Sequence, residues 1–143
     1  MEHRIAISAD HRGFLLKQYL IAHLGTVQWF DYGTHTPERT DYPLFVPPLV
    51  EALKAGMVDY GILICGTGVG MAIAANRHRG IYAGLVWNAE VARRAKEDDN
   101  VNVLVIPADY LTKDEAVKCI ASWIAASFKG GRYQERFSLI DPS

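Results

Sequence analysis

Short apolar runs alternate along the chain with stretches in which apolar residues recur at helical spacing. Five of the runs have strand length and are rich in β-branched residues, as buried strands are. They occupy residues 4–9, 27–31, 61–65, 81–86 and 101–106. Strands that alternate with helices in this way pair in parallel and carry helices on both faces. The pattern therefore predicts an α/β fold, a three-layer (αβα) Rossmann-like sandwich with a five-stranded parallel sheet.

Local signals indicate where several of the helices begin. Proline lacks an N–H group but fits the first turn of a helix, so the helix in residues 44–55 is expected to start late or near Pro47. Thr112 and Glu115 have the spacing of a capping box and are expected to open the last long helix. The tail from residue 129 is basic and aromatic, and we expect an extended segment there.

Composition limits the protein to one domain and excludes several classes of function. The chain has 143 residues, of which 50% are hydrophobic, and carries a formal charge of -1. Residues 1–143 are therefore expected to form a single globular domain. The chain contains no run of five basic residues, which argues against a surface for nucleic acid or anionic membranes. No apolar stretch has the length of a membrane span, and we expect no signal peptide.

The cysteines and histidines give expectations about compartment and metals. Cys65 and Cys119 fall in a strand end and a helical pattern, which favours reduced thiols in a cytoplasmic protein over a disulfide framework. The five histidines show no ligand spacing such as His-x-x-x-His. We therefore expect no metal site.

The segment from Cys65 to Met71 is the strongest candidate for chemistry. Cys65 ends a predicted strand, and Gly66, Gly68 and Gly70 follow it in a turn that opens into a helix. Ligands bind at this position in open α/β sheets, where free N–H groups and the helix dipole favour an anion. The same field is expected to lower the pKa of the thiol. The alternative is a cysteine that serves only as a small buried hydrophobic residue. The motif is neither a P-loop nor a Rossmann fingerprint.

Other strand ends carry polar groups that could join Cys65. Asp10 and His11 follow the first strand, although Asp10 could act only as a helix cap and His11 only as a surface residue. Trp87-Asn88 follows the fourth strand, and residues 98–102 precede the fifth. Arg132 and Arg136 lie four residues apart and would share one face of a helix, where they could equally form salt bridges or face solvent.

Several motifs, in order along nearly the whole chain, resemble the family of type B ribose-5-phosphate isomerases and galactose-6-phosphate isomerases. The most specific is the Cys-Gly-Thr-Gly-x-Gly-Met block that starts at Cys65. The other matching segments are Ile-Ser-Ala-Asp-His-x-Gly-Phe at 7–14, Asp-Tyr-Gly-Thr at 31–34, Asp-Tyr-Pro at 41–43, Asn-Val-Leu at 102–104 and Phe-x-Gly-Gly-Arg-x-x-x-Arg at 128–136.

This resemblance implies a cofactor-free and metal-free aldose–ketose isomerase that works through an enediolate. It assigns the proton transfer to Cys65, with Thr67 and Asp98 as the other catalytic candidates. The remaining matches imply contacts with a phosphorylated sugar, in which the loop amides stabilise the intermediate, Asp10 contacts hydroxyl groups, and His11 and the two arginines hold the phosphate. The implied substrate-binding residues are Asp10, His11, Tyr42, Gly66, Gly68, Gly70, Asp99, Arg132 and Arg136. The resemblance also implies a homodimer or homotetramer with the site at the subunit interface, and a tail, residues 129–143, that packs on the partner.

Three positions depart from the ribose-phosphate pattern of the family. Asp98-Asp99 stands where that pattern carries His-Asn, whose His opens the sugar ring. Asp109 replaces a basic residue that helps to hold phosphate, and Trp87-Asn88 stands where His-Asp is common. An uncompensated carboxylate near a phosphate dianion would be repulsive by about 1 kcal/mol or more.

The departures leave the substrate open. Ribose 5-phosphate and ribulose 5-phosphate are the default pair, with Asp98 or His11 opening the ring. A tetrose 4-phosphate would need no ring opening, and a hexose 6-phosphate such as galactose 6-phosphate is a further alternative. A subunit that binds sugar phosphate without catalysis is the remaining alternative, which the intact Cys65 loop disfavours.

Overall fold

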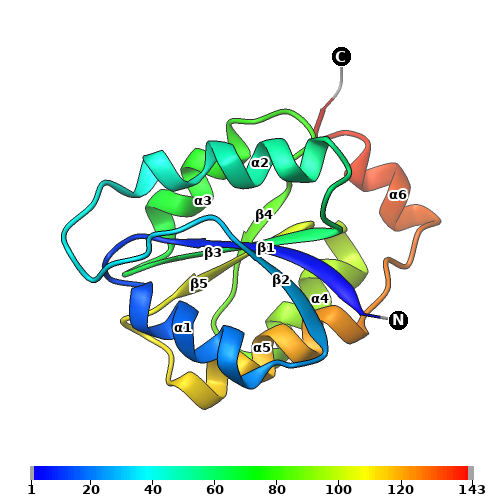
Figure 1. The fold of residues 1–143 in the computed structure, drawn as a ribbon. Helices are drawn as coiled ribbons and strands as arrows, with labels where there is room; N and C mark the ends of the chain where they lie inside the picture. The colour runs from blue at the N-terminus through cyan, green and yellow to red at the C-terminus, as the bar shows by residue number, and fades with distance from the viewer. Residues whose placement is uncertain (1, 142–143) are drawn as a thin grey trace.

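A parallel sheet forms the middle layer of the computed structural model, which describes residues 2–141 (Figure 1). Within this range the sheet has five strands in the order β2-β1-β3-β5-β4, and every neighbouring pair is parallel. The strands are β1 His3–Ala9, β2 Val27–Asp31, β3 Tyr60–Cys65, β4 Ala83–Leu85 and β5 Val103–Pro107. The predicted five-stranded parallel sheet is confirmed.

Helices cover both faces of the sheet and complete the three predicted layers (Figure 1). One face is covered by α1 Phe14–His23, α4 Ala89–Asp99 and α5 Lys113–Ala125. The other is covered by the 3-10 helix η1 Tyr42–Phe45, α2 Pro47–Lys54 and α3 Val69–Asn76. A last helix, α6 Arg132–Phe137, lies beside α4. Among residues 2–141, none of the helices has the length and apolar character that crossing a bilayer requires.

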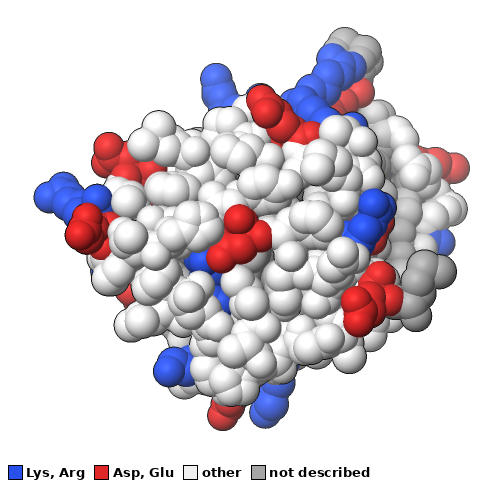
Figure 2. All heavy atoms as spheres, in the orientation of Figure 1, with Lys and Arg blue, Asp and Glu red and all other residues white. Residues whose placement is uncertain are grey.

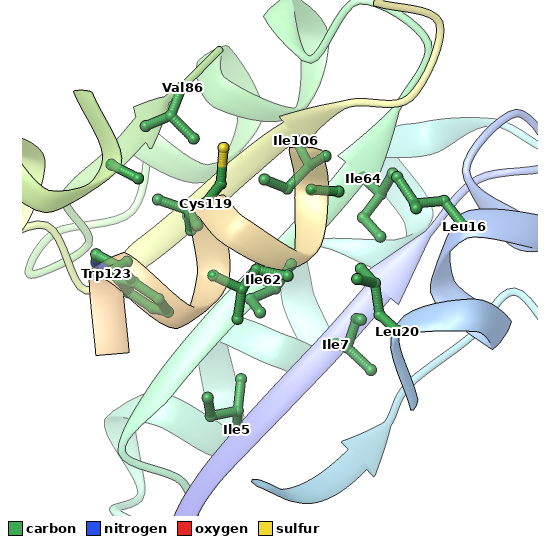
Figure 3. Close-up of a cluster of buried hydrophobic side chains, with 14 of the residues drawn as sticks. Ile5, Ile7, Leu16, Leu20, Ile62, Ile64, Val86, Ile106, Cys119 and Trp123 are labelled. Carbon is green, nitrogen blue, oxygen red and sulfur yellow. The ribbon is translucent and has the colours of Figure 1, made fainter. Parts of the chain in front are cut away.

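Alternation along the strands divides the core into two clusters. Ile62 and Ile64 of β3 point to the side of α1 and α5, in the cluster drawn in Figure 3 around Trp123. Leu63 and Cys65 point to the side of α2 and α3. This follows from the two-residue period of a strand, which sends successive side chains to opposite faces. Cys65, the last residue of β3, therefore faces the start of α3.

The predicted helix starts are confirmed, and one prediction about the tail is wrong. Helix α2 begins at Pro47, and the Thr112–Glu115 capping box is present. The tail was expected to be extended, but it forms α6 and packs on its own chain. Gly130 and Gly131 turn the backbone with positive φ angles of 67° and 54°, and the ring of Phe137 then lies against those of Tyr82 and Phe128. Packing of the tail on a partner remains a prediction, and residues 142–143 lie outside the described range.

Charged side chains of both signs are interspersed on the face of the molecule in Figure 2, rather than gathered by sign. Two lysines among the described residues are buried instead: Lys17 on α1, whose Nζ pairs with Asp31 at 2.6 Å, and Lys96 on α4. The Nζ of Lys96 lies over the rings of Tyr60 and Trp123, 4.1 Å and 4.8 Å from their centroids, and the two rings also contact each other. The same Nζ also donates a hydrogen bond of 3.5 Å to the carbonyl of Ile124. Burial lowers the pKa of Lys96 to about 8.

Burial of Lys96 should make the stability of the fold rise with pH above pH 8. Between the native pKa of about 8 and the ordinary value of 10.5, the unfolded chain binds the lysine proton more often than the native chain does. The free energy of unfolding should therefore gain up to about 1.4 kcal/mol per pH unit from this group. Urea unfolding of Lys96→Met at pH 7, 8.5 and 9.5 should show a flatter pH dependence than the native protein. Lys118→Met, on the exposed side of α5, is the control and should keep the native slope. An unchanged slope in Lys96→Met would contradict the assignment.

Candidate active site

The thiol of Cys65 lies at the junction between β3 and α3. Its Sγ accepts a hydrogen bond of 3.2 Å from the N–H of Gly68, the residue that caps the start of α3. The Cys65 side chain is almost enclosed, with 5% of its surface exposed. The hydroxyl of Thr67, which is exposed, accepts a bond of 3.2 Å from the N–H of Val69 and so caps the same turn. The loop that the sequence singled out therefore surrounds the sulfur with backbone donors.

Two glycines of this loop are required by its geometry. Gly68 has a φ of +78°, and a Cβ at this position would lie 2.4 Å from Cδ1 of Leu85. A Cβ at Gly70 would lie 2.5 Å from the ring of Tyr42 in η1. A side chain at either position would push the loop away from the sheet or from η1. The structure thus places Tyr42 against the first turn of α3, close to Cys65.

The predicted lowering of the Cys65 pKa is wrong. Burial has the largest influence and raises the pKa of the thiol. The N–H groups of Met71 and Gly68 act in the lowering direction, the negative charge of Asp10 raises the pKa further, and the N–H of Thr67 lowers it. The sequence showed the donors of the loop but not how deeply the sulfur lies in the core. Burial thus favours the protonated thiol over the thiolate.

Asp10 and His11 lie at the same edge of the sheet as Cys65. Asp10 is 5% exposed, and its Oδ1 accepts bonds from the N–H groups of Arg12 (3.0 Å) and Gly13 (3.1 Å). It closes the turn before α1, whose own N-cap is Gly13 without a side-chain bond. Oδ2 is the oxygen that this turn does not engage, which suits it to a ligand hydroxyl. Thr40 fixes the imidazole of His11, because its N–H donates to Nδ1 at 3.2 Å. A neutral His11 therefore carries its proton on Nε2.

An ion pair that sequence reasoning missed covers the Cys65 loop from outside. The guanidinium of Arg12 and the carboxylate of Asp109 are bonded to each other. A Cβ on Gly66 would lie 2.8 Å from both Arg12 Nε and Asp109 Oδ2. The two residues are 97 positions apart, so no local pattern could have joined them.

The other predicted site residues lie at the opposite edge of the sheet. Helix α4 runs back from the carboxyl end of β4 to the start of β5, so Asp98 and Asp99 at its end lie at the amino edge. Arg132 and Arg136 on α6 lie there too, on the side of the chain's N-terminus (Figure 1). Within one chain, the expectation that residues 98–102 join the Cys65 pocket is wrong. The sequence pattern showed that residues 98–102 are next to the fifth strand, but these residues precede that strand and so lie at the amino edge of the sheet.

Asp98 is engaged at the amino edge by two cations. Its carboxylate accepts bonds from Lys129 (3.1 Å) and Arg94 (3.3 Å). Partial desolvation acts to raise the pKa of Asp98, but these two bonds outweigh it and hold the pKa below its ordinary value. Asp98, Asp99 and Trp87 line a single groove of about 400 Å³ along β4. Two of the three departures from the ribose-phosphate pattern, Asp98-Asp99 and Trp87, thus share one groove. The third, Asp109, lies against Gly66 of the Cys65 loop.

Comparison with known proteins identifies the family. A family model described as Ribose/Galactose Isomerase matches residues 5–140. The chain belongs to this ribose/galactose isomerase family. Ribose-5-phosphate isomerase B of Escherichia coli strain K12 is 40% identical over 139 residues, which cover 96% of this chain and 93% of the relative.

Solved structures of other members of the ribose/galactose isomerase family share the whole fold. The ribose 5-phosphate isomerase of Thermotoga maritima superposes with a TM-score of 0.97 at 36% identity and covers 100% of both chains. The ribose-5-phosphate isomerase B of Mycoplasma genitalium, whose structure contains bound ribulose-5-phosphate, has a TM-score of 0.92 at 38% identity and covers 98% of this chain and 95% of that chain. The resemblance inferred from the motifs and the predicted fold are both confirmed.

The geometry of the loop predicts that Gly68 is needed for two reasons: its left-handed backbone conformation and the lack of space for a Cβ beside Leu85. Gly68→Ala should lose about 1–2 kcal/mol from the left-handed conformation and about 1–3 kcal/mol more from contact with Leu85. Gly80→Ala is the matched control, because Gly80 has a similar φ of +83° but nothing within 4 Å of an added Cβ. Urea unfolding of both variants measures the difference, and equal losses of stability would show that the contact with Leu85 has no effect.

Proposed function

We propose that this protein is a metal-independent aldose–ketose isomerase that interconverts ribose 5-phosphate and ribulose 5-phosphate, with Cys65 as the base. The observation that carries the proposal is the placement of the Cys65 sulfur among backbone donors at the start of α3, beside Asp10. Membership of the ribose/galactose isomerase family and the bound ribulose-5-phosphate in the Mycoplasma genitalium relative support this substrate pair. Both cysteines are free thiols, which supports a reducing, cytoplasmic compartment.

In the proposed reaction the thiolate of Cys65 removes the proton from C2 of the open-chain aldose and returns it to C1. Negative charge develops on the substrate oxygen in the enediolate and must be stabilised. The N–H groups of Thr67, Gly68 and Met71 act on the sulfur, where they stabilise the thiolate. We assign the enediolate oxygen to the amides of Gly66 and Gly70, the other members of the loop. The hydroxyl of Thr67 accepts from the N–H of Val69 and keeps its own proton for a sugar hydroxyl.

A second copy of the chain is proposed to complete the site. The predicted phosphate ligands Arg132 and Arg136 lie at the amino edge, far along the sheet from Cys65, so one chain does not bring them together. Beside the Cys65 loop, α3 exposes Val69 (51%) and Ile73 (61%), which lie four residues apart on one helix face. Such an apolar face suits a symmetric contact between copies. In the resulting homodimer, the two arginines of one chain would hold the phosphate near His11 of the other chain.

The ion pairs of Asp98 bear on how the sugar ring opens. A carboxylate that is bonded to Lys129 and Arg94, with a lowered pKa, is a weak base. His11 has its Nε2 proton fixed by Thr40, and this N–H can hydrogen-bond to the ring oxygen while water carries the proton of the anomeric hydroxyl to that oxygen as the C1–O bond breaks. We therefore favour His11 over Asp98 for ring opening. The groove that collects Trp87, Asp98 and Asp99 supports one second candidate, an isomerase with a preference for a tetrose or hexose phosphate.

Replacement of Cys65 tests the base directly. Cys65→Ala should reduce kcat by about a thousandfold or more while calorimetry still detects ribulose 5-phosphate. Because burial raises the Cys65 pKa, kcat/KM of the native enzyme should rise about tenfold per pH unit through neutral pH. Cys119→Ala, in the opposite core cluster, is the matched control and should retain activity.

The assay should include ribose, erythrose and galactose phosphates side by side. If erythrose 4-phosphate or galactose 6-phosphate is turned over fastest, the protein is an isomerase that prefers a tetrose or hexose phosphate, and the ribose 5-phosphate proposal is wrong. Native protein that binds these sugars but turns over none of them, with Cys65→Ala binding equally well, would identify a non-catalytic subunit.

Complementation between inactive variants tests the shared site. Cys65→Ala and Arg136→Gln should each be inactive, but a mixture refolded together should recover about a quarter of native activity, because half of the dimers then contain one intact site. A mixture of Cys65→Ala with Asp10→Asn is the matched control. Both of those residues lie at the same edge of one chain, so every mixed site remains defective. Equal recovery in the two mixtures, or none in either, would refute the proposed arrangement.

A further inference from the structure

Arg12 and Asp109 join two turns across the backbone of the Cys65 loop. Arg12 lies in the turn that Asp10 caps after β1, where its N–H donates to Asp10 Oδ1 at 3.0 Å. Asp109 follows the end of β5, and its N–H donates to the carbonyl of Gly66 at 3.0 Å. The ion pair between their side chains rests on Gly66, the residue next to Cys65. Any field that this pair produces therefore acts at the site of the thiol.

The surroundings of Cys65 make the charge of this pair important. Asp10, in the turn after β1, raises the pKa of the thiol by its charge. His11 follows it at the same edge, Tyr42 in η1 lies against Gly70, and the pair lies against Gly66. The helices α2 and α3 contribute apolar side chains to the cluster around Cys65. The thiolate, the enediolate and a sugar phosphate are all anionic, and Asp109 alone would repel each of them.

We propose that Arg12 is a positioning residue that neutralises Asp109, and that the pair sets the electrostatic potential at Cys65 and its anionic ligand. Because Arg12 neutralises it, the carboxylate of Asp109 can lie over the Cys65 loop while the loop still binds an anion. Its effect on the thiol does not depend on the proposed function, whereas its effect on turnover does.

An ordinary surface salt bridge would not have this role. Such pairs contribute little to stability, and the side chains of Arg12 and Asp109 are 56% and 32% exposed. A pair that only packs against Gly66 would disturb the loop in the same way whichever partner was removed. A pair that acts by charge must respond in opposite directions, since one substitution leaves a carboxylate and the other leaves a guanidinium. This difference in sign separates the two roles.

The test measures alkylation of Cys65 by iodoacetamide without substrate, between about pH 6 and pH 9, where the thiolate fraction controls the rate. Burial raises the pKa of Cys119 to about 11, so this second thiol stays protonated, and a Cys65→Ser variant corrects for any background. Arg12→Gln should slow alkylation at pH 8 by about threefold or more, and Asp109→Asn should accelerate it by a similar factor. The double variant should return towards the native rate. All of these changes should shrink in 1 M salt, where the screening length is about 3 Å.

Arg4→Gln is the matched control. Arg4 pairs with Asp59 at 2.9 Å at the amino edge, with side chains that are 42% and 39% exposed, so its loss changes net charge equally but far from Cys65. It should leave alkylation unchanged. If Arg12→Gln and Asp109→Asn shift the rate in the same direction, or if the double variant is worse than either, the pair acts by packing and the proposal is wrong.

Turnover provides a second readout. If the protein is the proposed isomerase, Arg12→Gln should raise KM for ribose 5-phosphate about tenfold, and the added Asp109→Asn change should lower it again. Opposite shifts in alkylation without any isomerase activity would support the role of the pair while refuting the proposed function. A KM for Arg12→Gln that the second substitution does not lower would contradict the proposal for the ligand.

Discussion

The hydrogen bond from the Gly68 N–H to the Cys65 sulfur is the contact on which the site depends. It requires β3 to end at Cys65 and α3 to begin four residues later, so that the free amides of the first helical turn face back towards the strand. That reversal needs a left-handed residue, and the side chain of Leu85 excludes any Cβ at this point. On the other side, the ring of Tyr42 lies 2.5 Å from where a Cβ on Gly70 would be. Packing around the loop therefore determines both its sequence and the direction of its donors.

The same packing opposes the chemistry that the donors promote. A sulfur that is held in the core between β3 and α3 loses hydration, and this raises its pKa more than the amides lower it. The resting thiol is therefore protected from deprotonation and oxidation, as a buried cysteine usually is. Any group that alters the electrostatic potential at the sulfur therefore changes the fraction of Cys65 that is present as thiolate. Asp10 does so by its charge, and we propose the same for the Arg12–Asp109 pair.

The fold was predictable from the sequence because its signals are local. Each strand of the sheet is an apolar run bounded by polar or glycine residues, and the Thr112 capping box and Pro47 mark helix starts within a few positions. The Cys65 loop could be found for the same reason, since strand, glycines and helix are contiguous. What the sequence could not provide depends on distance in space. The Arg12–Asp109 pair, the burial of Lys96 against two rings and the depth of Cys65 all arise from residues that are remote along the chain.

The separation of the predicted site residues has a topological cause with a functional consequence. In a parallel sheet every strand ends at the same edge, and every connecting helix returns the chain to the other edge. Residues at the ends of β1 and β3 therefore meet, whereas residues at the end of α4 cannot reach them. The proposed site draws on both edges, since it joins Cys65 to Arg136, and it can form only if two copies place opposite edges together. The positions of these residues before or after their strands therefore support the proposal that two copies of the chain form the site.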